Sequence, residues 1–206
     1  MKIGGLLKFT LIDFPGRPAA VIFTQGCNFR CRYCHNPELV YPHMFTEPVA
    51  EEEIDAFLKR RQGTLEGVVV SGGEPTLFDD LPQFLSKLKS MGYAVKLDTN
   101  GTRPDMLKEI IDNKLVDFIA MDLKAPLEKY ALITGVEFNM SIIQQSMDLI
   151  RNAGIGYEFR TTYDKEVLTD ADIEAISHMA GGHYRVQECL PVAKEKAALK
   201  VLHDEL

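Results

Sequence analysis

The sequence predicts an α/β fold built on an open, six-stranded parallel partial (β/α)6 barrel. Short β-rich apolar runs alternate regularly with longer segments of helical periodicity, as expected for βαβ units with right-handed crossovers. Six such units can be counted along the chain. A closed barrel needs eight units and typically about 250 residues, whereas this chain has 206. A doubly wound flat sheet is the alternative arrangement.

The predicted strands are short runs dominated by Val, Ile, Ala and aromatic residues, which favour buried parallel strands. The first, 19–24, reads AAVIFT and leads directly into a loop with three cysteines. The others are predicted at 67–71, 94–98, 116–122, 157–162 and 184–188.

Between these strands, apolar residues spaced three and four apart predict helices. Thr46 and Pro48 mark the start of a first helix over 47–61, and Gly92 is placed to end the next one. Later helices are predicted at 104–113, 141–153 and 168–179, the last with Thr169 as a plausible cap, and a charged helical tail from 193 on.

The pattern predicts a single domain without low-complexity linkers. It consists of an N-terminal extension (1–18), the barrel core (19–188) and a C-terminal tail (189–206). The net charge of -7 argues against nucleic acid as a partner, because phosphate binding needs clustered cationic charge. No apolar stretch is long enough to span a membrane, and the N-terminus does not resemble a secretory signal. A cytoplasmic protein is therefore expected.

Three of the four cysteines, Cys27, Cys31 and Cys34, lie in one short loop. Three thiolates can hold three irons of a cubane iron–sulfur cluster and leave the fourth iron open to a small molecule. The alternative is a structural zinc site completed by His35. The direct adjacency of Cys34 and His35 favours iron–sulfur, because structural zinc sites usually draw ligands from two separated segments. Cys189 is expected to be a core thiol.

Polar or glycine-rich elements follow five consecutive predicted strands, where both candidate architectures place their chemistry. After the cysteine loop comes Gly72-Gly73-Glu74 at the end of the second strand. The two glycines allow a ligand to approach the backbone closely, or form a plain turn. Glu74 is expected either to accept a hydrogen bond from an ammonium group or to cap the next turn.

The remaining strand ends carry charged candidates. Asp98 and Asp122 are suited to ribose hydroxyls or a cation, and equally to turns and caps. Lys124 is suited to a ligand carboxylate or to a solvated surface position. Arg160 lies within a strand, which favours a buried ionic role. Tyr33, in the cysteine loop, is expected to stack on an aromatic base or to pack the loop.

The spacing Cys27-x3-Cys31-x2-Cys34, with Tyr33 before the last cysteine, resembles the signature of radical S-adenosylmethionine (SAM) enzymes. Gly72-Gly73-Glu74-Pro75 resembles their motif for the methionine amino group, and the match extends over 19–160. The resemblance implies a partial barrel of the radical SAM type, a [4Fe-4S] cluster on the three cysteines, and SAM. The implied cofactor-binding residues are Tyr33, His35, Gly72, Gly73, Glu74, Asp98, Asp122, Lys124 and Arg160.

Segments 5–16 and 23–31 narrow the resemblance to glycyl-radical-enzyme activating proteins, most similar to those of anaerobic ribonucleoside-triphosphate reductase. Segments 34–37, 98–101 and 122–124 also resemble pyruvate formate-lyase activating enzyme. That resemblance implies a monovalent-cation site from Asp98, Thr99 and Asp122, and SAM contacts from Lys124 and Arg160. One departure is that Leu190-Pro191 is followed by Val192-Ala193, without the histidine found there, which leaves the contribution of the last strand open.

The implied activity is an oxidoreductase that works anaerobically. SAM is reductively cleaved at the cluster, and the resulting 5′-deoxyadenosyl radical generates a glycyl radical on a partner enzyme. A flavodoxin- or ferredoxin-type protein would donate the electron. Three alternatives stay open: a pyruvate formate-lyase-type activase, a 7-carboxy-7-deazaguanine-synthase-like enzyme acting on a small molecule, and a zinc-binding interaction module.

Overall fold

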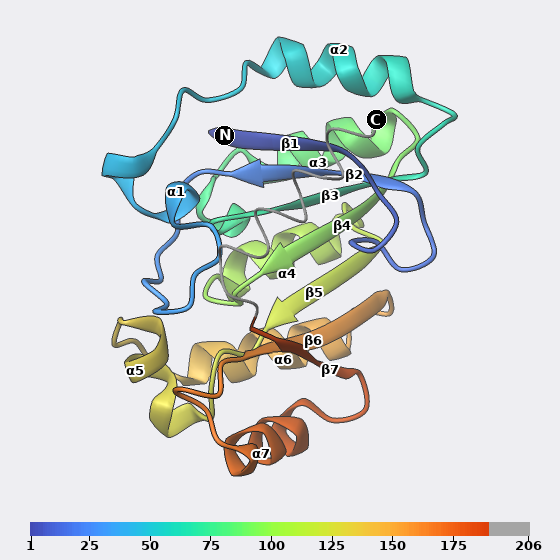
Figure 1. The fold of residues 1–206 in the computed structure, drawn as a ribbon. Coiled ribbons are helices and arrows are strands. Elements are labelled where there is room, and N and C mark those ends of the chain that lie inside the picture. Colours follow the sequence, from blue (N-terminus) through green and yellow to red (C-terminus); the bar gives the residue numbers. More distant parts are fainter. Residues whose placement is uncertain (190–206) are drawn as a thin grey trace.

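The computed structural model describes residues 1–189, which contain one seven-stranded sheet whose strands lie side by side in chain order (Figure 1). The strands are β1 (Ile3–Thr10), β2 (Ala19–Thr24), β3 (Gly67–Gly72), β4 (Ala94–Thr99), β5 (Phe118–Asp122), β6 (Gly156–Tyr163) and β7 (Tyr184–Glu188). Strands β2 to β7 are all parallel to one another. The predicted open, six-stranded parallel arrangement is therefore confirmed.

Helices connect these strands and, in Figure 1, α3, α4 and α6 lie together on one side of the sheet. The α-helices are α1 (Pro37–Val40), α2 (Glu51–Arg61), α3 (Leu81–Ser90), α4 (Pro104–Asp112), α5 (Tyr130–Thr134), α6 (Ser141–Arg151) and α7 (Asp170–Ala180). Three short 3-10 helices are η1 (Pro42–Met44), η2 (Pro75–Leu77) and η3 (Leu127–Lys129). A doubly wound sheet requires a reversal of strand order, and the order here has none, so that alternative is wrong.

The N-terminal extension contains a strand that the sequence pattern did not predict. Strand β1 runs antiparallel to β2, with Leu6 opposite Ile22. Gly4, Gly5 and Lys8 interrupt its apolar pattern, and glycine and lysine have low β-propensity. Pairing with the exposed edge of β2 therefore decides the conformation of this segment.

Helix α2 begins at Glu51, so the prediction that it starts near Thr46 and Pro48 is wrong. The residues before Glu51 are not helical, because they form hydrogen bonds with strand β1 and with the residue after β2. The backbone N–H of Val49 donates to the carbonyl of Ile3 (2.8 Å), and the Gln25 side chain donates to the carbonyl of Thr46 (2.9 Å). These hydrogen bonds hold the backbone of Thr46 and Val49, which therefore does not form the first turn of the predicted helix. The predicted tail helix from 193 on lies outside the described residues.

Other helix boundaries follow the local signals in the sequence. Thr169 caps α7 in a reciprocal capping box with Asp172, as predicted. Gly92 and Gly154 lie beyond α3 and α6 with φ of 88° and 69°, a conformation in which glycine avoids the Cβ penalty. No helix in residues 1–189 is both long enough and apolar enough to cross a membrane.

Alternate residues of the strands divide between two apolar clusters, as the period-2 geometry of a strand requires. Val68 and Val70 belong to the large core that also contains helix residues. Val69, between them, packs with Val21 and Phe14 in a smaller cluster on the other side of the sheet. Phe14 comes from the loop between β1 and β2. The two clusters together cover both faces of the sheet.

Candidate active site

A cavity of about 280 Å³ lies at the carboxyl ends of the parallel strands. Every site residue that the sequence analysis singled out lines it, from the cysteine loop to β6. These residues are Cys27, Cys31, Tyr33, Cys34, His35, Gly72, Gly73, Glu74, Asp98, Thr99, Asp122, Lys124 and Arg160. Segments up to about 130 residues apart thus converge on one site, as the parallel topology predicts.

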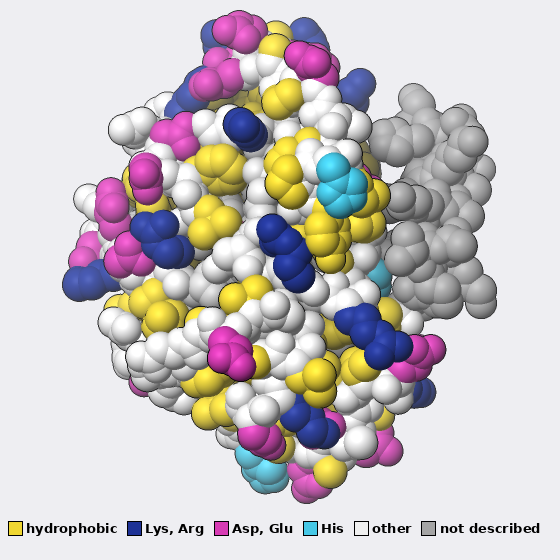
Figure 2. Space-filling model, turned by 90° about the vertical axis from the view of Figure 1, so that its left-hand side faces the viewer, with side chains coloured by type: hydrophobic (Ala, Val, Ile, Leu, Met, Phe, Trp, Pro, Cys, Tyr) yellow, Lys and Arg dark blue, Asp and Glu magenta, His cyan; other side chains and the backbone are white. Residues whose placement is uncertain are grey.

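The edge of the molecule that carries these strand ends faces the viewer in Figure 2. Hydrophobic side chains and those of Lys and Arg lie near the middle of this face, and most acidic side chains lie toward its margins. Few acidic side chains therefore lie near the middle of this face, although the chain is acidic overall.

The cysteine loop is fixed by its non-cysteine residues. Phe29 is buried and packs against the rings of Tyr130 and Phe138, at 6.3 and 5.4 Å between centroids. The side chain of Asn28 bonds to both Asn100 and Thr102 in the loop after β4, at 2.8 Å in each case. These anchors leave the thiols of the loop free to line the cavity.

All three loop cysteines are free and half-buried. Burial raises the pKa of Cys27 to about 12, and it also raises the pKa values of Cys31 and Cys34. Thiols in such surroundings are poor nucleophiles but can serve as metal ligands, because bound iron or zinc displaces the proton. The loop is therefore better suited to holding a metal group than to covalent catalysis.

Gly72, the last residue of β3, and Gly73, which follows it, allow the cysteine loop to pack against the end of this strand. A Cβ at Gly73 would lie 2.0 Å from the carbonyl oxygen of Gly26, and one at Gly72 would lie 2.2 Å from the backbone nitrogen of Thr24. The N–H of Gly73 donates to the carbonyl of Thr24 at 2.9 Å. Gly72-Gly73 is thus needed for close contact between β3 and the cysteine loop.

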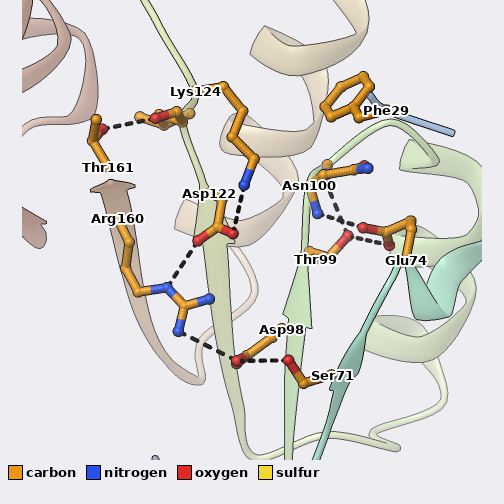
Figure 3. A network of polar contacts seen from close by, with 12 residues as sticks. Phe29, Ser71, Glu74, Asp98, Thr99, Asn100, Asp122, Lys124, Arg160 and Thr161 are labelled. Atoms are coloured by element: carbon orange, nitrogen blue, oxygen red, sulfur yellow. Dashed lines mark hydrogen bonds and ion pairs between the residues drawn. The ribbon is translucent and has the colours of Figure 1, made fainter. Parts of the chain in front are cut away.

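Glu74 is buried, and its carboxylate accepts four hydrogen bonds, of which Figure 3 shows those from Thr99 and Asn100. Two come from the backbone and hydroxyl of Thr76, one from the hydroxyl of Thr99 and one from the backbone of Asn100. Burial raises the pKa of Glu74, against the opposing effect of these donors. Glu74 therefore takes the capping role among the two expected for it, and ties β3 to β4.

A chain of ion pairs crosses the site from β4 to β6 (Figure 3). Arg160 donates to Asp122 at 2.9 Å and to Asp98 at 3.3 Å, and Lys124 donates to Asp122 at 2.9 Å. Burial opposes ionisation of Asp122, but Arg160 and Lys124 outweigh it and hold its pKa below the usual range. Asp122 in turn outweighs burial at Lys124 and Arg160 and keeps their pKa values above the usual range. All three side chains are therefore charged at neutral pH.

Tyr33 and His35, two of the expected cofactor-binding residues, also contact other residues of the protein. The hydroxyl of Tyr33 lies 3.4 Å from the carbonyl oxygen of Lys124, and burial raises its pKa. His35 lies 3.5 Å from the Sγ atom of Cys189. The expectation that Cys189 is a core thiol is wrong: it is half-buried beside the cysteine loop, because β7 ends at the same edge of the sheet.

Sequence reasoning missed several residues that build the site. Asn28 and Asn100 lock the cysteine loop to the loop after β4, and Lys96 pairs with Asp98 inside the sheet. A signal for Lys96 was present: it is flanked by Val95 and Leu97 in a buried strand and stands two residues before an aspartate, on the same face. The asparagines carried no comparable signal, because their partner lies in a distant segment.

Within residues 1–189, no three His, Cys, Asp or Glu side chains are arranged to hold a single metal ion.

Comparison with known proteins decides the family. The model of the radical SAM superfamily matches residues 21–180. The chain belongs to the radical SAM superfamily. A Methanocaldococcus jannaschii protein provisionally named as a glycyl-radical enzyme activating enzyme is 34% identical to this radical SAM chain, over 98% of it and 82% of the relative.

Two further similarities cover less of the other protein. The pyruvate formate-lyase-activating enzyme of Listeria monocytogenes is 34% identical over 55% of this radical SAM chain and 49% of its own length. The structure of native anSMEcpe with bound AdoMet matches with a TM-score of 0.63 at 18% identity, over 81% of this chain and 50% of the other. The chain thus spans about half the length of these two proteins, and the second similarity shows the fold alone.

Radical SAM proteins hold a [4Fe-4S] cluster and SAM, and the residues present fit both. Three thiols from one loop line the same cavity as two partly buried cations, Lys124 and Arg160. Three thiolates suit three irons of a four-iron cluster. Cationic side chains at the cavity wall suit the carboxylate of an amino acid such as the methionine part of SAM.

Proposed function

We propose that this chain is a radical SAM activase that generates a glycyl radical on a partner enzyme. The observation that carries the proposal is the convergence of the three-cysteine loop and four charged or glycine-rich strand ends on one cavity. Similarity over nearly the whole chain to a protein provisionally named as an activating enzyme supports the same assignment.

Cys27, Cys31 and Cys34 would hold the cluster. When bound and reduced, the cluster supplies one electron that breaks the S–C5′ bond of SAM, which yields methionine and the carbon radical that removes a hydrogen atom from a glycine Cα. The protein's own task is to fix the loop geometry. Phe29 and Asn28 do so by packing and by hydrogen bonds to the loop after β4.

Lys124 and Arg160 would orient SAM through its carboxylate. Both are held by Asp122, so their positions are set before a ligand arrives. Gly72 and Gly73 would present backbone groups to the methionine amino group, and Tyr33 would border the adenine base. Glu74 would act indirectly, since its four acceptor contacts fix the strand ends around the site.

The partner would be a glycyl radical enzyme, with anaerobic ribonucleoside-triphosphate reductase as the first candidate and a pyruvate formate-lyase-type enzyme as the second. Segments 5–16 and 23–31 support the first. An electron donor of the flavodoxin or ferredoxin type would reduce the cluster. The scarcity of acidic side chains near the middle of the face in Figure 2 supports docking of another protein there.

The cluster assignment is tested by cysteine variants. After anaerobic reconstitution, the wild-type chain should bind about four irons, and with SAM and dithionite it should release 5′-deoxyadenosine. Cys31→Ala should lose this release by at least about a hundredfold, because one iron loses its ligand. Cys189→Ala is the matched control and should keep the iron and the release. Retention of SAM cleavage by Cys31→Ala would refute the proposal.

A further inference from the structure

Six charged side chains form a continuous set of ion pairs inside the sheet, beneath and beside the cavity. We call them the interior ion chain: Lys96, Asp98, Asp122, Lys124, Glu158 and Arg160. They come from β4, β5 with its following loop, and β6. Arg160 is the central member, because it contacts all three carboxylates of the set.

Lys96 is the most deeply buried member of this set, with 1% of its side chain exposed. Its Nζ lies 2.5 Å from Oδ1 of Asp98, which stands two residues later on the same face of β4. Lys96 is not among the residues that line the cavity. Within residues 1–189, its ion pair with Asp98 connects it to the site.

The other oxygen of Asp98 connects this pair to the cavity wall. Its Oδ2 accepts from Ser71 at 3.2 Å and from Arg160 at 3.3 Å. Arg160 in turn binds Asp122, which binds Lys124. The position of Lys96 is thus transmitted to both cations that face the cavity.

Among the residues that the structure describes, the interior ion chain is balanced. Lys96, Lys124 and Arg160 supply three positive charges, and Asp98, Asp122 and Glu158 supply three negative ones. Glu158 also meets Arg185, whose side chain is half exposed and screened by water. A further cation would leave an uncompensated buried charge, which is costly.

The monovalent cation expected at Asp98, Thr99 and Asp122 would therefore compete with Arg160 for the two carboxylates. Asp98 and Asp122 are joined by Arg160. The hydroxyl of Thr99 donates to Glu74, at the other side of β4 from Asp98.

We propose that Lys96 is a built-in cation that positions Asp98 and Arg160 and makes SAM binding by this chain independent of a monovalent metal ion. The inference rests on the SAM site of the proposed function. Lys96 is a positioning residue, since it acts through Asp98.

The variant Lys96→Met removes the charge and keeps most of the side-chain volume. It leaves the interior ion chain with one negative charge in excess, next to the oxygens of Asp98. Hard cations prefer oxygen ligands, so Na⁺ or K⁺ should occupy the place of the ammonium group. The variant should bind SAM at least about tenfold more weakly without such a cation, because a buried carboxylate has lost its partner, and should recover with it.

The experiment measures SAM affinity by equilibrium dialysis of the anaerobically reconstituted, unreduced protein, without turnover. Choline, sodium and potassium chloride are compared at one ionic strength. Wild type should bind SAM equally in all three, whereas Lys96→Met should require sodium or potassium. Lys89→Met is the matched control: it removes a lysine–aspartate pair with Asp117 away from the cavity, and it should behave as wild type.

Three outcomes would overturn the inference. Wild-type affinity that rises tenfold when choline is replaced by potassium would show that a metal ion is needed, and this arm stands even where the variant fails to fold. Unchanged SAM affinity of Lys96→Met in choline, or weak affinity that no cation restores, would also refute it. Wild type that binds no SAM in any salt would instead refute the proposed function.

Discussion

At the scale of single residues, Arg160 and Arg185 offer a direct comparison, because they stand opposite each other on β6 and β7. Arg160 is buried between Asp98 and Asp122, whereas half of the Arg185 side chain is exposed. Arg160→Met should weaken SAM binding by about tenfold or more, because two partly buried carboxylates lose a partner. Arg185→Met should change it less than about twofold. Equilibrium dialysis compares the two, and equal losses would contradict a specific role for Arg160.

Gly73 provides a second comparison at this scale. A Cβ at this position would lie 2.0 Å from the carbonyl oxygen of Gly26, whereas a Cβ at Gly182 would meet nothing within 4 Å. Gly73→Ala should lower the free energy of unfolding by about 1–3 kcal/mol through overpacking and reduce iron incorporation. Gly182→Ala should do neither. Urea unfolding and iron analysis of both variants measure this, and a fully stable Gly73→Ala would rule out the tight contact.

The candidate site was largely predictable at the residue scale, because its motifs have fixed spacing and parallel strands bring their carboxyl ends together. For Glu74 only the cap on the following turn was predictable; its bonds to Thr99 and Asn100 were not, because these donors lie in a distant segment. Lys96 was overlooked because a lysine in a strand is usually solvated. Its pairing with Asp98 depends on both side chains facing the interior of the sheet.

At the scale of elements, the six parallel strands and most helices were predicted because apolar periodicity reports burial directly. β1 was missed, since its two glycines hide the pattern and only the edge of β2 makes it a strand. The start of α2 was misplaced because Val49 is held by the backbone of Ile3, a contact that local sequence does not encode.

The N-terminus of α7 tests the local signals that did succeed. Thr169 forms a capping box with Asp172, so Thr169→Ala should cost about 1 kcal/mol and lower the Tm by roughly 2–4 °C in a chain of this size. Ser177→Ala, at an exposed position within the same helix, should leave the Tm unchanged or slightly raise it. Thermal unfolding by circular dichroism compares the two, and equal Tm values for both variants would refute the cap.

At the scale of the whole molecule, the open sheet brings the three-cysteine loop and a charged wall to one edge. The interior ion chain fixes the charged wall from below, and the cysteine loop is fixed from the side by Asn28 and Phe29. The interior ion chain and the contacts of Asn28 and Phe29 are both formed by the protein itself. This arrangement suits a protein that holds a ligand in a preformed site.

Transfer of deuterium from the partner tests the proposed activity most directly. The reconstituted chain, SAM and dithionite are incubated with anaerobic ribonucleoside-triphosphate reductase, or with a pyruvate formate-lyase-type enzyme, whose glycines carry deuterium at Cα. Mass spectrometry should find one deuterium in the released 5′-deoxyadenosine, together with a glycyl radical signal by electron paramagnetic resonance. Unlabelled 5′-deoxyadenosine with no radical on either partner would contradict the assignment as an activase.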